Sequence, residues 1–113
     1  MWEAQNYING EFVNSNSDSV FDNIDPCNEE PLGIFFNSTK SEVDEAYNAA
    51  RNSLAEWKAM SRVQRAEYLY EVAKLIEERR DALARAISYE TGKNYNESIA
   101  EVNEALHMAQ YAF

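Results

Sequence analysis

The chain has few of the residues that mark disulfide-bonded, disordered or membrane-spanning proteins. Its 113 residues include one cysteine, two prolines and three glycines. A single cysteine excludes an internal disulfide framework, and a 45% hydrophobic composition excludes a disordered tail. No apolar run reaches the length of a spanning helix, and the N-terminus has no basic start followed by an apolar run. These absences predict a folded cytoplasmic chain of at most one domain.

Basic residues are absent from the first third of the chain. Residues 1–39 carry seven acids and no Lys or Arg, and the formal net charge of the whole chain is −10. This balance repels a phosphate backbone and an anionic membrane surface. We therefore expect neither nucleic acid nor a membrane as a partner.

The first 38 residues predict short strands. Asn9-Gly10 separates two short apolar segments at residues 7–8 and 11–13, which indicates a hairpin with a type I′ turn. Residues 20–24 form the next expected strand, which ends at Asp25-Pro26. After a turn over residues 26–31, residues 32–36 form a further apolar strand.

From Thr39 onwards the apolar period changes from two to about three and a half, which predicts helices. Each helix begins with polar residues able to cap it. These residues are Thr39 with Glu42, Ser61 with Gln64, Asp81 for a continuation after about residue 80, and Asn94. Gly92 stands where a left-handed residue would end the third helix.

The helices carry apolar stripes at steps of three and four. The first stripe is Val43, Ala46, Tyr47, Ala50, Leu54 and Trp57, and the second is Ala66, Leu69, Ala73 and Ile76. The last is Ile99, Val102, Leu106, Ala109 and Phe113. We expect Trp57 to be a buried anchor. We expect the last row to face residues beyond Phe113, so that the isolated chain self-associates.

Short strands followed by about four helices indicate an α/β fold, or α+β in the isolated chain. We expect one partial domain over residues 1–113. Its strands and hairpin would occupy residues 1–38, and its helical layer residues 39–113.

The residues that could carry chemistry on their own are few. Cys27, the single thiol, lies in an acidic turn without a neighbouring base to activate it. His107, the single histidine, has no second histidine with which to build a metal site. The three glycines are far apart, so the chain has no Gly-rich phosphate loop. We expect no catalytic and no cofactor-binding residue.

Four marks occur in a characteristic order: Tyr7-Ile8-Asn9-Gly10-Glu11-Phe12, Asp25-Pro26, Trp57 and Glu90-Thr91-Gly92-Lys93. Together they resemble the N-terminal region of the aldehyde dehydrogenase superfamily, over about residues 7–113. The resemblance implies the front part of a Rossmann-like coenzyme-binding domain. It implies a parent enzyme that uses NAD or NADP to oxidise an aldehyde or semialdehyde to a carboxylate. In that family the nucleophilic cysteine, the general-base glutamate and the nucleotide loop come later in the sequence, so this segment would be architectural and inactive.

The resemblance also implies a structural monovalent cation. Its ligands would be an oxygen of Asn23 or Ile24, before the Asp-Pro turn, together with Glu90 before Gly-Lys. Hard cations favour such oxygen ligands. The alternative is that Glu90 only supports the end of its helix.

A second hypothesis comes from a different class of protein. The chain could be a self-contained acidic helical module that binds a protein through an exposed apolar stripe. In the dehydrogenase interpretation the partners are an aldehyde substrate of the parent and further copies of the subunit, bound through exposed helical surface.

Overall fold

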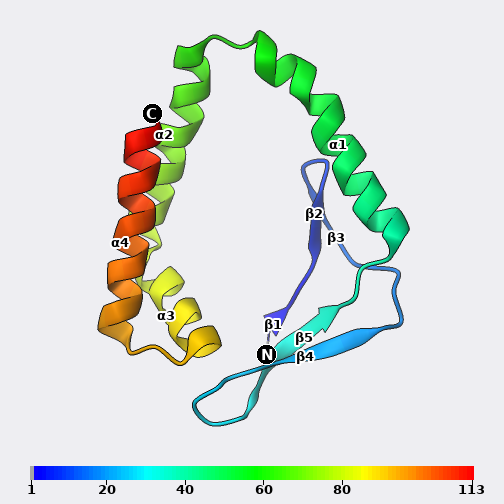
Figure 1. The fold of residues 1–113 in the computed structure, drawn as a ribbon, viewed down its shortest axis with the longest axis vertical. Coiled ribbons are helices and arrows are strands. Elements are labelled where there is room, and N and C mark those ends of the chain that lie inside the picture. Colours follow the sequence, from blue (N-terminus) through cyan, green and yellow to red (C-terminus); the bar gives the residue numbers. More distant parts are fainter. Residues whose placement is uncertain (1) are drawn as a thin grey trace. The chain divides into compact units, whose positions relative to one another are not determined.

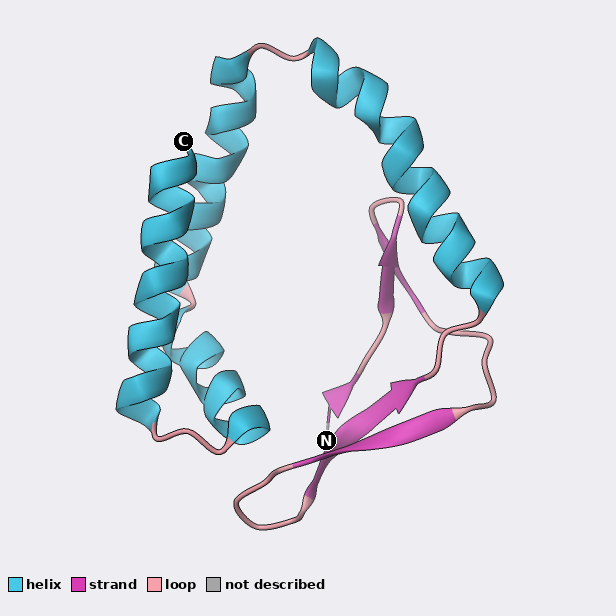
Figure 2. Cartoon of the chain, viewed as in Figure 1, coloured by secondary structure: helices cyan, strands magenta, loops and turns pink. Residues whose placement is uncertain are grey.

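The computed structural model describes residues 2–113, and its contacts divide the chain into two compact units, Met1–Ala59 and Met60–Phe113. Figure 1 shows the elements in chain order, and Figure 2 separates helices from strands. The described strands all lie in the first unit together with helix α1. Helices α2, α3 and α4 form the second unit. The predicted order of short strands followed by four helices is confirmed.

The first unit contains a mixed three-stranded sheet and a separate hairpin. In the sheet the strand order is β1 (Trp2–Glu3), β5 (Pro31–Phe36) and β4 (Val20–Ile24), with β1 parallel and β4 antiparallel to β5. The hairpin pairs β2 (Asn6–Ile8) with β3 (Glu11–Val13). Positive φ angles of 52° at Asn9 and 86° at Gly10 confirm the turn expected from the Asn-Gly pair.

Gly33 allows β1 to approach β5. Trp2 stands opposite Gly33 in the parallel register, and a Cβ atom at position 33 would lie 2.3 Å from the backbone oxygen of Trp2. No side chain fits at that distance. Strand β1 could not be predicted from the sequence, because its two residues are too few to show a period.

Helix α1 (Lys40–Ala59) begins at the predicted capping box. The Thr39 N–H donates to the Glu42 carboxylate at 2.7 Å, and the Glu42 N–H donates to the Thr39 hydroxyl at 3.3 Å. The helix contacts strand β2 of the hairpin. Helix α1 therefore groups with the strands in the first unit, Met1–Ala59.

The second unit packs three helices around a small core. These are α2 (Arg62–Glu78), α3 (Arg80–Thr91) and α4 (Tyr95–Ala112), and α4 contacts both of the others. The predicted Ser61–Gln64 capping box starts α2, and the Asn94 side chain caps α4. The buried apolar residues are Ala73 from α2, Ala84 from α3, and Val102 and Leu106 from α4. Small residues on α2 and α3 thus face larger ones on α4.

Three expectations are corrected by this packing. The apolar row of α4 does not depend on residues beyond Phe113 for its burial, because Val102 and Leu106 are buried within the second unit. Trp57 is not a buried anchor, since 40% of it is exposed. Asp81 does not cap α3: Arg79 occupies the N-cap position without a side-chain hydrogen bond, and the Asp81 carboxylate accepts a bond from the Tyr95 hydroxyl at 2.8 Å.

The Leu106→Ala substitution should destabilise the second unit by about 2–5 kcal/mol, because it removes buried apolar contacts and leaves a cavity. Met108→Ala on the same helix is the matched control, since Met108 is 64% exposed and its loss should change little. Chemical denaturation followed by circular dichroism measures both. Equal effects of the two substitutions would show that the α4 row is not the core.

The Gly33→Ala substitution should detach β1 from β5, because the new Cβ atom would overlap the Trp2 backbone. We expect a loss of about 1–3 kcal/mol, as is typical of overpacked sites. Amide exchange at Ala4, whose N–H donates to the Ile34 carbonyl, reports the pairing directly. Unchanged protection at Ala4 would contradict the close approach.

Candidate functional site

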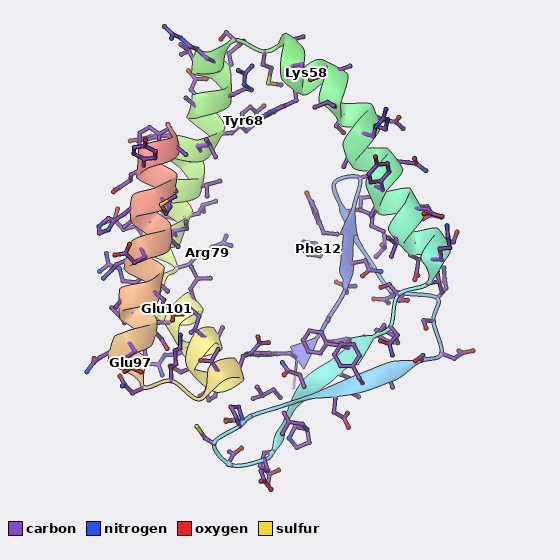
Figure 3. The ribbon with its side chains drawn as sticks, in the orientation of Figure 1. Phe12, Lys58, Tyr68, Arg79, Glu97 and Glu101 are labelled. Carbon is purple, nitrogen blue, oxygen red and sulfur yellow. The ribbon has the colours of Figure 1, made fainter. Side chains whose placement is uncertain are left out.

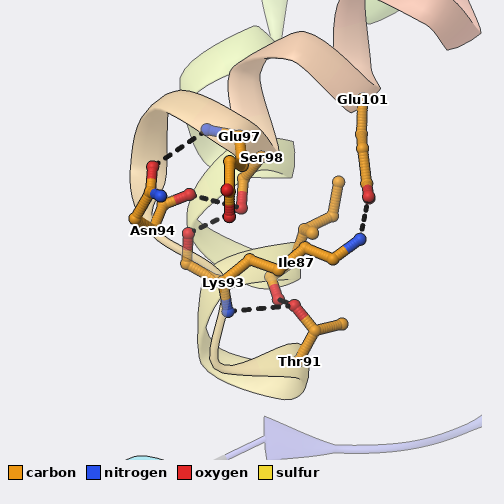
Figure 4. A network of polar contacts seen from close by, with 8 residues as sticks. Ile87, Thr91, Lys93, Asn94, Glu97, Ser98 and Glu101 are labelled. Carbon is orange, nitrogen blue, oxygen red and sulfur yellow. Dashed lines mark hydrogen bonds and ion pairs between the residues drawn. The ribbon is translucent and has the colours of Figure 1, made fainter.

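The Glu-Thr-Gly-Lys segment forms the turn between α3 and α4 (Figure 4). Gly92 has a φ of 73° and its N–H donates to the Ser88 carbonyl at 2.9 Å, which confirms it as the left-handed end of α3. The Thr91 hydroxyl donates to the Ile87 carbonyl at 2.6 Å and accepts from the Lys93 N–H at 3.4 Å. The Glu-Thr-Gly-Lys motif therefore forms the turn that reverses the chain direction between α3 and α4.

Polar contacts across the turn fix α3 against the start of α4. The Asn94 side chain accepts from the Glu97 N–H at 3.1 Å. Ser98 is fully buried, and its hydroxyl lies 2.8 Å from that of Ser88 and 3.3 Å from the Asn94 carbonyl oxygen. Because a buried hydroxyl needs partners, this pair replaces solvent at the point where the two helices approach. Lys93 and Glu101 add an exposed ion pair.

Glu42 is the centre of the polar network in the first unit. Its carboxylate accepts hydrogen bonds from the Asn16 N–H at 2.7 Å, the Thr39 N–H at 2.7 Å and the Ser15 hydroxyl at 2.8 Å. These bonds hold the pKa of the Glu42 carboxyl at about 2, below its usual 4.5; the Asn16 N–H has the largest effect, followed by the Thr39 N–H, while burial opposes both. The carboxylate therefore ties the polar connector before β4 to the start of α1.

A second buried carboxylate organises the Asp-Pro turn. The Asp25 side chain accepts from the Cys27 N–H at 2.8 Å, and its backbone exchanges hydrogen bonds with Glu29 and Glu30 at 2.9 Å. Cys27 is exposed in this turn. Glu29 takes a positive φ of 61°, which closes the turn before β5. Asp25 therefore organises the turn in which Cys27 lies.

His107 lies on α4 with its side chain 65% exposed, 4.0 Å from the Glu104 carboxylate. Residues 2–113 contain no group of three or more His, Cys, Asp or Glu side chains placed to hold a metal ion.

The three residues considered for a monovalent cation are distributed over both units. Asn23 and Ile24 end β4 in the first unit, and Asn23 is half-buried there. Glu90 is exposed in the last turn of α3 in the second unit. The cation site stays a prediction.

The three glycines of the chain lie in three separate elements of the structure. Gly10 serves a hairpin turn, Gly33 a strand contact and Gly92 a helix end, so each glycine has a local structural function. Phosphate binding by a loop needs successive backbone N–H groups that converge on one point, usually with closely spaced glycines.

Sequence reasoning missed two side-chain clusters. One is the buried Ser88–Ser98 pair, because isolated serines on helices usually face solvent. The other joins Asp81, Arg85 and Tyr95: the Arg85 guanidinium lies 5.6 Å from the centre of the Tyr95 ring. The hydrogen bond to Asp81, with burial as the second cause, raises the pKa of the Tyr95 hydroxyl. Both clusters hold α3 to α4 and could be found only from the packing.

Comparison with known proteins identifies the family. The model of the aldehyde dehydrogenase family matches residues 12–113, and the chain belongs to that family. A malonate-semialdehyde dehydrogenase of Bacillus subtilis (strain 168) is 32% identical over 110 residues, which are 97% of this chain and 23% of the relative. The resemblance expected from the four sequence marks is confirmed.

Solved structures of the same family have the same fold. An NAD-dependent benzaldehyde dehydrogenase from Corynebacterium glutamicum matches with a TM-score of 0.91 and 28% identity, over 95% of this chain and 23% of that one. An NADP-dependent glyceraldehyde-3-phosphate dehydrogenase from Bacillus halodurans C-125 matches with a TM-score of 0.91 and 27% identity, over 97% and 24%. The chain thus spans about a quarter of the length of these proteins.

Two further findings concern the alternative hypothesis and membrane-spanning helices. The comparisons do not support the alternative of a self-contained acidic interaction module, since they align nearly the whole chain with dehydrogenases. Within residues 2–113, no helix combines the length and the apolar character that crossing a membrane requires.

The Glu42→Gln substitution should remove the acid-sensitive part of the first unit's stability. The folded-state pKa of Glu42 is lowered, so its stabilising effect is complete above about pH 4.5 and is lost as the pH falls toward 2. Melting temperatures of the natural chain and the variant should therefore differ most near pH 6 and converge near pH 2. Glu45→Gln, at an exposed position of the same helix, is the control. A difference independent of pH would contradict the assigned network.

Proposed function

We propose that this chain is part of an NAD(P)-dependent aldehyde dehydrogenase that oxidises an aldehyde or semialdehyde to a carboxylate. The main support for this proposal is the match of the family model to residues 12–113, together with similarity along 97% of the chain to a malonate-semialdehyde dehydrogenase. The named relatives use NAD or NADP and act on different aldehydes. We therefore assign a reaction class and leave the aldehyde open.

The role of these residues in that enzyme is architectural. Their polar side chains with defined partners serve helix caps, turns and helix contacts, as Glu42, Asp25 and Ser98 illustrate. The nucleophile and the coenzyme contacts would come from other parts of the enzyme. When bound, the coenzyme would accept a hydride from the substrate, and residues 2–113 would support the domain that holds it.

Two finer assignments belong to the same proposal. A monovalent cation would bind an oxygen of Asn23 or Ile24 together with Glu90, because hard cations favour carbonyl and carboxylate oxygens. The assembled enzyme would be a homo-oligomer, supported by exposed apolar residues on α2 such as Tyr68 and Leu75, which are 56% and 42% exposed. The net charge of −10 supports the absence of nucleic acid as a partner, and a sequence with a single cysteine is compatible with the cytoplasm.

The isolated chain should reduce neither NAD nor NADP in the presence of aldehydes, because its residues provide no activated nucleophile and no coenzyme loop. A chimera, here called the joined protein, would carry this chain in place of the matched 110 residues of the Bacillus subtilis relative. The joined protein should oxidise malonate semialdehyde. Absorbance of the reduced coenzyme at saturating substrate measures both activities.

The control variant is Cys27→Ser. It should leave the activity of the joined protein unchanged, because Cys27 lies in an exposed turn. Activity of the isolated chain that Cys27→Ser abolishes would overturn the architectural role. A folded joined protein without activity would contradict the assigned reaction.

A further inference from the structure

Five asparagines of the chain are followed by a glycine or a serine. An asparagine in this position can modify itself, because the backbone nitrogen of the next residue can attack its side-chain amide and close a succinimide ring. A small following residue hinders the attack least, and glycine, which has no Cβ, hinders it less than serine. The five pairs are Asn9-Gly10, Asn14-Ser15, Asn16-Ser17, Asn37-Ser38 and Asn52-Ser53. The structure distinguishes among them by what holds the reacting atoms.

Hydrogen bonds restrain the two asparagine–serine pairs in the connector before β4. The Asn14 side-chain oxygen accepts from the Gln5 amide at 2.8 Å. After Asn16, the attacking nitrogen would be that of Ser17, and its N–H donates to the Ser15 hydroxyl at 3.1 Å. Each bond opposes the rearrangement that ring closure needs.

The other two asparagine–serine pairs are restrained by a strand neighbour and by a helix. The Asn37 side-chain amide donates to the Ser19 hydroxyl at 2.9 Å, and the Asn37 backbone N–H donates to the Ser19 carbonyl at 2.9 Å. Asn52 lies inside α1, where the backbone bonds of the helix occupy the N–H of Ser53. All four asparagine–serine pairs are thus held in place by hydrogen bonds.

The Asn9-Gly10 pair lies at the exposed tip of the hairpin. The ladder between β2 and β3 ends with the Ile8–Glu11 pair, so both turn residues lie outside it. Both are exposed, and apart from its chain neighbours no atom lies within 4 Å of the position that a Cβ of Gly10 would take. Steric access to the attacking nitrogen therefore favours this pair over the other four.

The turn conformation opposes the reaction while the hairpin is closed. Asn9 has a φ of 52°, the left-handed conformation of a type I′ turn. In that conformation the Gly10 nitrogen points away from the Asn9 side chain, whereas ring closure needs both on the same side of the Cα–C bond. The hairpin must therefore open first. Two strands of three residues each are marginally stable by themselves, so we expect frequent local opening.

We propose that Asn9 is a site of spontaneous deamidation, and that opening of the β2–β3 hairpin controls its rate. The Gly10 nitrogen bonds to the side-chain carbonyl carbon of Asn9, the bond from that carbon to Nδ2 breaks, and Nδ2 leaves as ammonia with the proton of the Gly10 N–H. Water then opens the ring at either carbonyl, which leaves an aspartate or an isoaspartate at position 9. The reaction is independent of the proposed function, since it needs only the hairpin and water.

Deamidation would weaken the hairpin permanently. An isoaspartate adds one methylene group to the main chain, so Ile8 and Glu11 would no longer meet across a two-residue turn. Both products add a negative charge to residues 1–39, which have seven acids and no Lys or Arg. The modified fraction would therefore accumulate with the time that the hairpin spends open.

The test incubates the 113-residue chain at neutral pH and physiological temperature, with and without guanidinium chloride. Tandem mass spectrometry of proteolytic peptides gives the modified fraction at each asparagine, and chromatography separates isoaspartate from aspartate. In the folded chain Asn9 should react fastest of the five asparagines. In denaturant its rate should rise about tenfold or more, because the closed turn no longer protects it.

Two matched variants test whether the hairpin controls the rate. Tyr7 and Phe12 pack across the hairpin with ring centroids 4.9 Å apart, and Figure 3 shows the Phe12 side chain projecting from it. Phe12→Ala leaves the reacting atoms unchanged and should raise the Asn9 rate about two- to tenfold, the effect of losing one aromatic pair. Phe21→Ala removes a similar contact, with Phe35 at 5.7 Å, from the separate sheet and should leave the rate unchanged.

Three outcomes would overturn the proposal. One is a folded chain in which an asparagine before a serine reacts as fast as Asn9. Another is the same Asn9 rate in the folded and the denatured chain, which would show that the turn gives no protection. The third is the same Asn9 rate in both variants, which would show that ring closure does not depend on the hairpin. Circular dichroism checks that the variants keep their helices, and the first two comparisons use the natural chain, so they decide even where a variant unfolds.

Discussion

The Glu42 carboxylate is the interaction on which the first unit depends. It accepts hydrogen bonds from the connector at Ser15 and Asn16 and from the backbone of Thr39. One side chain thus fixes the entry to β4 and the start of α1 at the same point. Helix α1 also contacts strand β2 of the hairpin. The bonds keep the carboxylate ionised because each of them stabilises the charged form.

The second unit depends on a different device, the close contact of small residues between helices. Ala84 and Ser98 are both fully buried, one on α3 and one on α4. Their size brings the helix backbones together, and the Ser88 hydroxyl satisfies that of Ser98 at 2.8 Å. Larger residues on α4, Val102 and Leu106, then fill the space beside α2. Only four apolar residues are buried over the described chain, so the unit relies on capping and turn geometry as well as on its core.

These two devices explain how a segment of a dehydrogenase can be ordered without containing its chemistry. The residues that form the family's marks, Asn9-Gly10, Asp25-Pro26 and Gly92, each have a structural task in this chain. Apolar side chains on α1 and α2 stay exposed, as Leu54 and Leu75 illustrate. The contacts of the described residues therefore support an architectural role.

The sequence by itself determined the local structure, because caps and turns depend on residues a few positions apart. The Asn-Gly hairpin, the boxes at Thr39 and Ser61, the Gly92 helix end and the family could all be predicted from it. The sequence could not decide which apolar row is buried, since the spacing of apolar residues shows only that one face of a helix is apolar. The apolar rows of α4 and α1 have similar spacing, yet Leu106 is 7% exposed and Leu54 is 43% exposed.

Only the tertiary structure decided this difference in burial, because burial depends on which elements pack beside each helix. Helix α4 contacts α2 and α3, which contribute the buried residues Ala73 and Ala84, whereas residues 50–59 of α1 are all exposed. The strand β1 and the Asp81–Tyr95 bond were hidden for the same reason, since each depends on a residue distant in sequence. Helix ends are local properties, while burial belongs to pairs of elements that the chain brings together.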